Sequence, residues 1–163
     1  MSNNNEVQTL RGVVAVLRIT VGVILLVTWW ENLQGGIYTA DGITGLFNYI
    51  FNDNGGGPAF YRSAIEATIL QVPGLFAAFQ LVAEFLLGVG LIVGGLTPLI
   101  GLGATLFFFN LFLAYFGGHE WIWTYVLLTS AAFTVAFTRS GRVFGLDQVL
   151  VKSRGEPPIP FLW

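Results

Sequence analysis

The chain contains no cysteine and a single histidine, His119. Without cysteine it cannot form disulfides, iron–sulfur clusters or thiolate nucleophiles. One histidine cannot hold a haem between two axial histidines, and it leaves too few nitrogen and sulfur ligands for the usual zinc site. We therefore expect no metal site and no cofactor bound by this chain alone. If the protein takes part in redox chemistry, the cofactor is a diffusible quinone or a group held by a partner.

Charged residues are also scarce. Asp, Glu, Lys and Arg make up 10% of the 163 residues, against about 25% in an average soluble domain. The chain is 55% hydrophobic, with a mean hydropathy of +0.73. So few polar groups cannot cover a water-facing surface, which predicts a lipid bilayer as the main surroundings. The net charge of −2 argues against nucleic acid as a partner, because nucleic acid requires a basic face.

Four apolar stretches have the length needed to span a membrane, about 17 to 25 residues. With their flanking residues, the predicted spans are 11–33, 74–95, 98–116 and 121–138. Leu96 and Thr97 alone separate the second span from the third, between a Gly-Gly pair and a proline, which predicts a tight hairpin turn. The sequence thus predicts one transmembrane domain over 1–163, with a long outer loop at 34–73 and a cytoplasmic tail at 139–163.

The distribution of basic residues predicts the orientation of the chain. One side of the membrane would carry Arg11, Arg139, Arg142, Lys152 and Arg154. The other side would carry only Arg62, together with most of the acidic residues. By the positive-inside rule we expect both termini in the cytoplasm and the chain in the cell inner membrane.

The outer loop is long enough to have structure of its own. Asp41–Phe51 is amphipathic, and Ala59–Leu70 has the pattern of a second short helix beyond the breaker NDNGGGP at 52–58. We expect both short helices to lie on the outer membrane surface. The predicted fold class is an all-α polytopic membrane protein, an antiparallel four-helix transmembrane bundle with short interfacial helices in the long outer loop.

Charged residues within the predicted spans are the main candidates for a site. Glu84 lies near the middle of the second span and Arg18 slightly to the cytoplasmic side of the middle of the first. A charge at the centre of a spanning helix costs about 2.5–3.5 kcal/mol on insertion scales. Because the first two helices run antiparallel, we expect Arg18 and Glu84 to pair in the bundle interior, with Asn110 close by. Gln80 belongs to the same stripe as Glu84, four residues away.

The third and fourth spans carry similar stripes of small and polar residues. They are Gly103, Asn110, Ala114 and Gly117 on the third, and Ser130, Thr134 and Thr138 on the fourth. We expect all the polar residues of the spans to face inward and the large aliphatic residues to face lipid.

Two interpretations of the charged cluster remain open. It could be a structural polar core that fixes the register of the helices, or a ligand site that binds a quinone carbonyl or relays a proton. The candidate cofactor-binding residues are Arg18, Glu84, Asn110 and Gln80. No catalytic residue is identified.

Four segments together resemble the DoxX/DoxD family of small membrane proteins. They are LRITVGVILLVTWWENL at 17–33, FYRSAIEATIL at 60–70, FQLVAEFLLGVGLIVGGLTPLIGLGATLFFFNLFLAYFGG at 79–118 and GRVFGLDQVL at 141–150. The family pattern is matched at Arg18, Glu84, Thr97, Asn110, Gly145 and Asp147. The resemblance implies a link to quinone, because DoxD is a subunit of a thiosulfate:quinone oxidoreductase.

The leading hypothesis is an integral membrane subunit of a quinone-linked redox assembly, comparable to thiosulfate:quinone oxidoreductase. The chain would be at most a cofactor-free subunit of such an enzyme. The alternative is a non-catalytic accessory subunit that stabilises a larger respiratory or photosynthetic membrane complex. A small-solute transporter is a weaker alternative, because spans without broken helices or repeat symmetry do not match transporter architecture. Besides lipid, we expect as partners the protein subunits of a larger complex or further copies of the chain.

Overall fold

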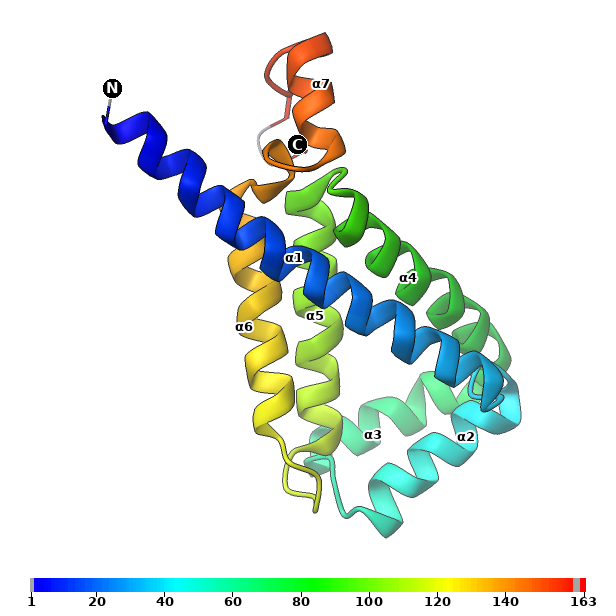
Figure 1. Cartoon of the computed structure of the whole chain (residues 1–163). Helices are drawn as coiled ribbons and strands as arrows, with labels where there is room; N and C mark the ends of the chain where they lie inside the picture. The colour runs from blue at the N-terminus through cyan, green and yellow to red at the C-terminus, as the bar shows by residue number, and fades with distance from the viewer. Residues whose placement is uncertain (1, 160–161) are drawn as a thin grey trace.

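The computed structural model describes residues 2–159 and 162–163, so residues 160 and 161 of the predicted tail lie outside the described residues. All the described elements are helical (Figure 1). They are α1 (Ser2–Gln34), α2 (Ala40–Asn48), the π-helical turn η1 (Tyr49–Asp53), α3 (Ala59–Ala67), the short 3-10 turn η2 (Ile69–Gln71), α4 (Pro73–Val93), α5 (Thr97–Tyr115), α6 (Trp123–Thr138), the 3-10 turn η3 (Ser140–Arg142) and α7 (Leu146–Arg154). The all-α fold class predicted from the sequence is confirmed.

Three helices of the described chain are long and apolar enough to cross a membrane: Asn5–Gln34 within α1, α4 and α5. Helix α6 is also apolar but has only 16 residues. At 1.5 Å per residue it covers about 24 Å, less than the roughly 30 Å of a bilayer's hydrocarbon core. Exposed tryptophans at 121 and 123 lie just before and at its first residue, and tryptophan is the residue type that anchors helix ends at the membrane interface. The chain is a helical membrane protein with three long apolar helices and a shorter fourth.

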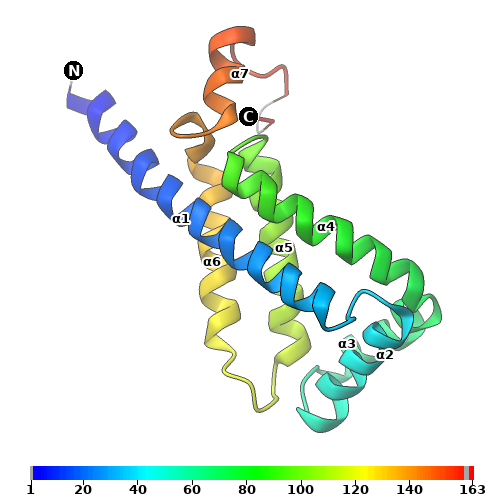
Figure 2. The same cartoon turned by 45° about the vertical axis from the view of Figure 1, so that its right-hand side comes forward.

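The four apolar helices form two pairs that cross obliquely. Helices α1 and α4 lie side by side, and so do α5 and α6 (Figures 1 and 2). The pairs meet near the end of the molecule that carries both chain termini, which we call the terminal end. They diverge toward the opposite end, the cap end, where α2 and α3 lie between them (Figure 1). The bundle is therefore a wedge that is closed at the terminal end and capped at the other.

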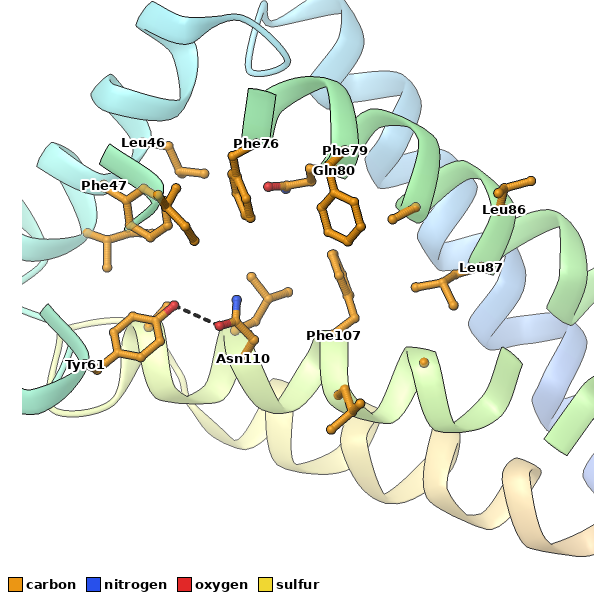
Figure 3. Close-up of a pocket in the computed structure, with 17 residues that line it drawn as sticks. Leu46, Phe47, Tyr61, Phe76, Phe79, Gln80, Leu86, Leu87, Phe107 and Asn110 are labelled. Carbon is orange, nitrogen blue, oxygen red and sulfur yellow. Dashed lines mark hydrogen bonds between the residues drawn. The ribbon is translucent and has the colours of Figure 1, made fainter. Parts of the chain in front are cut away.

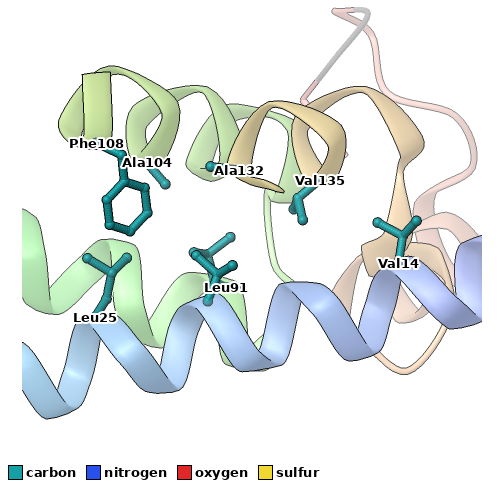
Figure 4. Packing of buried hydrophobic residues seen from close by; sticks show 8 residues of the cluster. Val14, Leu25, Leu91, Ala104, Phe108, Ala132 and Val135 are labelled. Atoms are coloured by element: carbon teal, nitrogen blue, oxygen red, sulfur yellow. The ribbon is translucent and has the colours of Figure 1, made fainter. Parts of the chain in front are cut away.

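Glycines allow close contact at both helix crossings. A Cβ atom on Gly22 of α1 would lie 2.9 Å from the carbonyl oxygen of Gly88 of α4. A Cβ atom on Gly101 of α5 would lie 2.8 Å from the backbone of Ala136 of α6. The apolar core fills the space between the two pairs, with Leu25, Leu91, Phe108 and Val135 among its buried members (Figure 4).

The tight turn predicted between the second and third spans is present. Gly94 ends α4 with φ +64°, and Leu96 precedes α5 with φ +50°. Both angles are left-handed, a conformation that glycine adopts freely and that strains leucine by about 1–3 kcal/mol. The strained leucine needs support from elsewhere in the chain, and the tail supplies it, as described below.

The short helices of the loop between α1 and α4 close the cap end of the wedge. Ile43 and Phe47 of α2 and Ile65 of α3 are buried in one apolar cluster with residues of α4 and α5. The side chain of Asn54 is also buried, and its oxygen accepts the backbone N–H groups of His119 and Glu120 at 3.0 and 3.1 Å. These hydrogen bonds connect the cap to the loop that joins α5 to α6. The cap helices therefore pack against the protein as well as facing the membrane surface.

Which end of the wedge faces the cytoplasm is a testable prediction. Because the chain has no cysteine, single cysteines at Asp53 and Ser153, both exposed at opposite ends, can be labelled without background. In intact cells a membrane-impermeant maleimide is expected to label the cysteine at position 53 and to label the one at 153 only after lysis. The reverse pattern would mean that the protein has the opposite orientation in the membrane. Labelling of both positions from outside would exclude the arrangement of helices described above.

Candidate functional site

A cavity of about 530 Å³ lies in the wedge between α4 and α5, next to the cap helices α2 and α3 (Figure 3). Its wall is mostly apolar and rich in aromatic rings, contributed by Phe47, Phe76, Phe79 and Phe107. Several wall residues are also exposed on the outside of the bundle: 65% of Phe79, 54% of Leu86 and 69% of Leu106 is accessible. The cavity therefore opens sideways, between α4 and α5, toward the lipid.

Three polar side chains interrupt this apolar wall. The amides of Gln80 on α4 and Asn110 on α5 lie on opposite walls (Figure 3). The hydroxyl of Tyr61, on α3, donates a hydrogen bond to Asn110 Oδ1 at 3.1 Å. Burial raises the pKa of Tyr61 to about 12, so the phenol stays protonated at neutral pH. Asn110 is partly accessible from outside the cavity, and the one hydrogen bond described for its side chain is the one that Oδ1 accepts. The amide nitrogen can therefore donate to a ligand in the cavity.

The stripe predicted on the third span forms one wall of this cavity. Gly103, Asn110 and Ala114 all line it, because positions three or four apart share a face of a helix. Glycine and alanine leave the space, and asparagine supplies the polar group. Gly117 lies beyond the end of α5 and does not contribute.

Glu84 lies next to the cavity on the side of α4 that faces α1. Its side chain is fully buried. The hydroxyl of Tyr38, from the loop between α1 and α2, donates to Glu84 Oε2 at 2.8 Å. The amides of Asn32 and Gln80 lie beside the same carboxylate, while Oε1 has no well-formed hydrogen bond to any described residue. Gln80 is thus shared between the buried carboxylate and the cavity.

The predicted pairing of Arg18 with Glu84 is wrong. Arg18 lies at the terminal end against Gly94, which is ten residues, or about 15 Å of helix, from Glu84. The register of the two helices is fixed by the contact of Gly22 with Gly88 and by the hydrogen bond from Trp29 Nε1 to the carbonyl of Leu81, at 3.0 Å. Both contacts place Glu84 opposite the end of α1 that leads into the cap.

The three residues of the predicted cluster therefore belong to three different places. Glu84 is bonded to Tyr38, Asn110 is bonded to Tyr61 at the cavity wall, and Arg18 is bonded to the tail. Of the predicted candidates, Gln80 and Asn110 share the cavity and Glu84 adjoins it. Sequence reasoning missed Tyr38 and Tyr61, because nothing in a loop sequence indicates which tyrosine folds back onto a span.

A second buried polar cluster, outside the cavity, joins the tail to the bundle. The guanidinium of Arg18 donates to the carbonyl of Phe144 at 2.7 Å. The carboxylate of Asp147 accepts the backbone N–H groups of Leu96 and Thr97 at 2.7 and 2.9 Å. Asp147 thus caps the N-terminus of α5, where Leu96 is strained, and its negative charge also acts on Arg18. Arg18 Nε and Nη1 have no hydrogen-bond partner among the described residues, and neither Arg18 nor Asp147 lines the cavity.

Of the stripe predicted on the fourth span, Thr138 is half-buried, but the other two residues do not face inward. Ser130 and Thr134 are exposed on the outer face of α6. Each hydroxyl donates to the carbonyl four residues earlier, at 2.8 and 2.9 Å. A hydroxyl that is satisfied by its own helix can face lipid at little cost, so it does not have to point into the bundle.

Comparison with known proteins identifies the family. The sequence profile of DoxX matches residues 13–120, which cover α1 from residue 13 onward, the cap helices, α4, α5 and the whole cavity. No curated protein and no solved structure matches the chain.

Proposed function

Because the chain belongs to the DoxX family of membrane proteins, we propose that it is a membrane subunit of a redox assembly and binds a quinone headgroup in the cavity between α4 and α5. The observation that carries this proposal is the amide donor Asn110 Nδ2 in an apolar cavity that opens to lipid. A ligand that enters from the bilayer and carries a hydrogen-bond acceptor matches both properties.

The size and the polar groups of the cavity support a quinone in particular. Its 530 Å³ lies within the range of about 300–1,000 Å³ typical of small-molecule sites. A quinone ring is flat and apolar, with carbonyl oxygens on opposite edges. The amides of Gln80 and Asn110 lie on opposite walls (Figure 3) and can each donate to a carbonyl. The isoprenoid tail would leave between α4 and α5 toward the lipid.

A redox role requires a partner. The chain has no cysteine and one histidine, so an iron–sulfur or bis-histidine haem centre would be held by another subunit. Aromatic walls and two amides can bind and orient a quinone ring, and the quinone itself supplies the electron-accepting chemistry. We place this subunit in the cell inner membrane, with the terminal end in the cytoplasm, where the partner would dock.

Replacing Asn110 by leucine tests the site. The variant keeps the number and branching of the side-chain heavy atoms but removes the amide donor and the hydrogen-bond partner of Tyr61. Loss of one buried hydrogen bond to the ligand corresponds to about 1–1.5 kcal/mol, so we expect a quinone with a decyl tail to bind about tenfold more weakly in lipid nanodiscs. Quenching of tryptophan fluorescence by the quinone measures the affinity.

Asn52→Leu is the matched control, because Asn52 is exposed on the cap and does not line the cavity. It should bind as the unaltered chain does. Equal affinities for the Asn110 variant and the control would place the ligand elsewhere. No saturable binding by any variant would favour the accessory subunit, whose role is structural.

A further inference from the structure

Glu84 is a buried carboxylate in which one oxygen has a well-formed hydrogen bond and the other does not. Tyr38 donates to Oε2 at 2.8 Å, and Oε1 has no well-formed partner among the described residues. An ionised carboxylate can only accept hydrogen bonds, whereas a protonated one also donates. Oε1 is therefore the place where a change in protonation would change the neighbouring hydrogen bond.

The neighbour that can respond is Gln80. Its amide lies beside the Glu84 carboxylate and also lines the cavity. An amide has a donating nitrogen and an accepting oxygen, and rotation about one bond exchanges them. Beside an ionised Glu84 the NH₂ group turns toward the carboxylate and the oxygen faces the cavity. Beside a Glu84 protonated on Oε1 the oxygen accepts that proton's hydrogen bond, and the NH₂ group faces the cavity.

The opposite wall of the cavity does not change with Glu84. The oxygen of Asn110 is held by the Tyr61 hydroxyl, so its NH₂ group stays available to a ligand. The cavity therefore offers two donors when Glu84 is protonated, and one donor and one acceptor when Glu84 is ionised. A quinone presents two carbonyl acceptors and matches the first arrangement. A quinol presents hydroxyls, which both donate and accept, and matches the second.

We propose that the proton on Glu84 selects the oxidation state of the quinone that the cavity binds, with Gln80 as the positioning residue. This inference rests on the proposed function, since it assigns a preference to the same site. Ionised Glu84 favours the quinol and protonated Glu84 favours the quinone. Binding of the ligand and uptake of one proton are thereby linked.

The other polar and charged groups around Glu84 do not provide a competing proton site beside Gln80. Burial and the Glu84 carboxylate raise the pKa of Tyr38, so its phenol stays a donor. Helix α1 contributes the uncharged Asn32, and the charges at its two ends do not form an ion pair with Glu84. Helix α2, which packs on α4, has one charged residue, Asp41, exposed in its first turn. We therefore assign the pH response of ligand binding to Glu84.

The experiment measures the affinity of the full chain in lipid nanodiscs for a decyl-benzoquinone and, without oxygen, for its quinol, from pH 5 to pH 9. Because one proton is linked to binding, the ratio of quinol to quinone affinity should rise with pH by up to about tenfold per unit and then level off. Glu84→Gln cannot titrate, and its ratio should be constant. Glu66→Gln, an exposed residue of α3, should keep the rise.

A milder variant keeps the test decisive if Glu84→Gln does not fold. Tyr38→Phe removes a donor that stabilises the ionised carboxylate, so the midpoint of the rise should move to higher pH while its height is kept. A constant ratio in the unaltered chain, with both forms bound, would overturn this inference and leave the proposed function intact. A rise that persists in Glu84→Gln would assign it to another group. If neither the quinone nor the quinol binds, the proposed function itself would be contradicted.

Discussion

Replacing Asp147 by alanine is expected to lower the free energy of unfolding by on the order of 3–5 kcal/mol, as happens when one partner of a buried charge network is removed. Its two oxygens accept the N–H groups of Leu96 and Thr97, and the carboxylate is fully buried. Each N–H group left unpaired costs about 1–3 kcal/mol. The change would also remove the negative charge that acts on Arg18 and the cap that holds Leu96 in a left-handed conformation.

The midpoint of thermal unfolding in mild detergent measures this effect. Gln148→Ala is the control, because Gln148 is the next residue of α7 and is exposed; it should change the midpoint little. A double-mutant cycle of Arg18→Gln with Asp147→Asn should show that the two changes together cost less than their sum. Strict additivity would mean that the two charges act independently. An unfolding midpoint for Asp147→Ala equal to that of the unaltered chain would refute the capping role.

The fold class followed from hydropathy, but the positions of the charges did not. Hydropathy locates a span to within a few residues and says nothing about how far one helix is shifted along its neighbour. In this chain the shift is set by Gly22 against Gly88, a contact of two small residues that leaves no signal in a hydropathy profile. As a result, two charges that seem to lie at similar depth are separated by about 15 Å of helix.

The partner of Arg18 could not be found by searching the spans. It comes from the tail, where Phe144 offers a carbonyl and Asp147 a carboxylate. The resemblance to the DoxX/DoxD family had marked both Arg18 and Asp147 as matching positions, so the residues were visible separately. What linked them was the return of the tail onto the α4–α5 turn, a long-range contact that no local pattern indicates.

The sequence predicted some of the residues that line the cavity, but not that a cavity forms. The stripe on the third span identified Gly103, Asn110 and Ala114 as one face, and Gln80 was a candidate on the second span. That these faces enclose a space, and do not pack against each other, follows from the divergence of the two helix pairs (Figure 1). The divergence depends on the cap helices filling the wide end, and the sequence of the loop shows only that such helices form.

Alanine at Gly22 and alanine at Gly12 are expected to have opposite effects, although both residues belong to α1. A Cβ atom on Gly22 would lie 2.9 Å from the carbonyl oxygen of Gly88 and 3.0 Å from the backbone nitrogen of Ile92. These are backbone atoms of α4, which can move only if the helices separate. Overpacking of this kind costs about 1–3 kcal/mol. A Cβ atom on Gly12 meets nothing within 4 Å, so alanine there should stabilise the helix by up to about 1 kcal/mol.

The same pair of variants tests whether the register of α1 on α4 matters for the site. Thermal unfolding in detergent should show a lower midpoint for Gly22→Ala and an equal or higher one for Gly12→Ala; two similar midpoints would contradict the crossing at Gly22. Separation of α1 from α4 would also weaken the hydrogen bond of Trp29 to Leu81 and move Tyr38 relative to Glu84. The affinity for quinol at high pH should therefore fall in Gly22→Ala, even at temperatures where the protein is folded. Gly12 lies on the other side of Arg18, far from this contact, and its variant should bind normally.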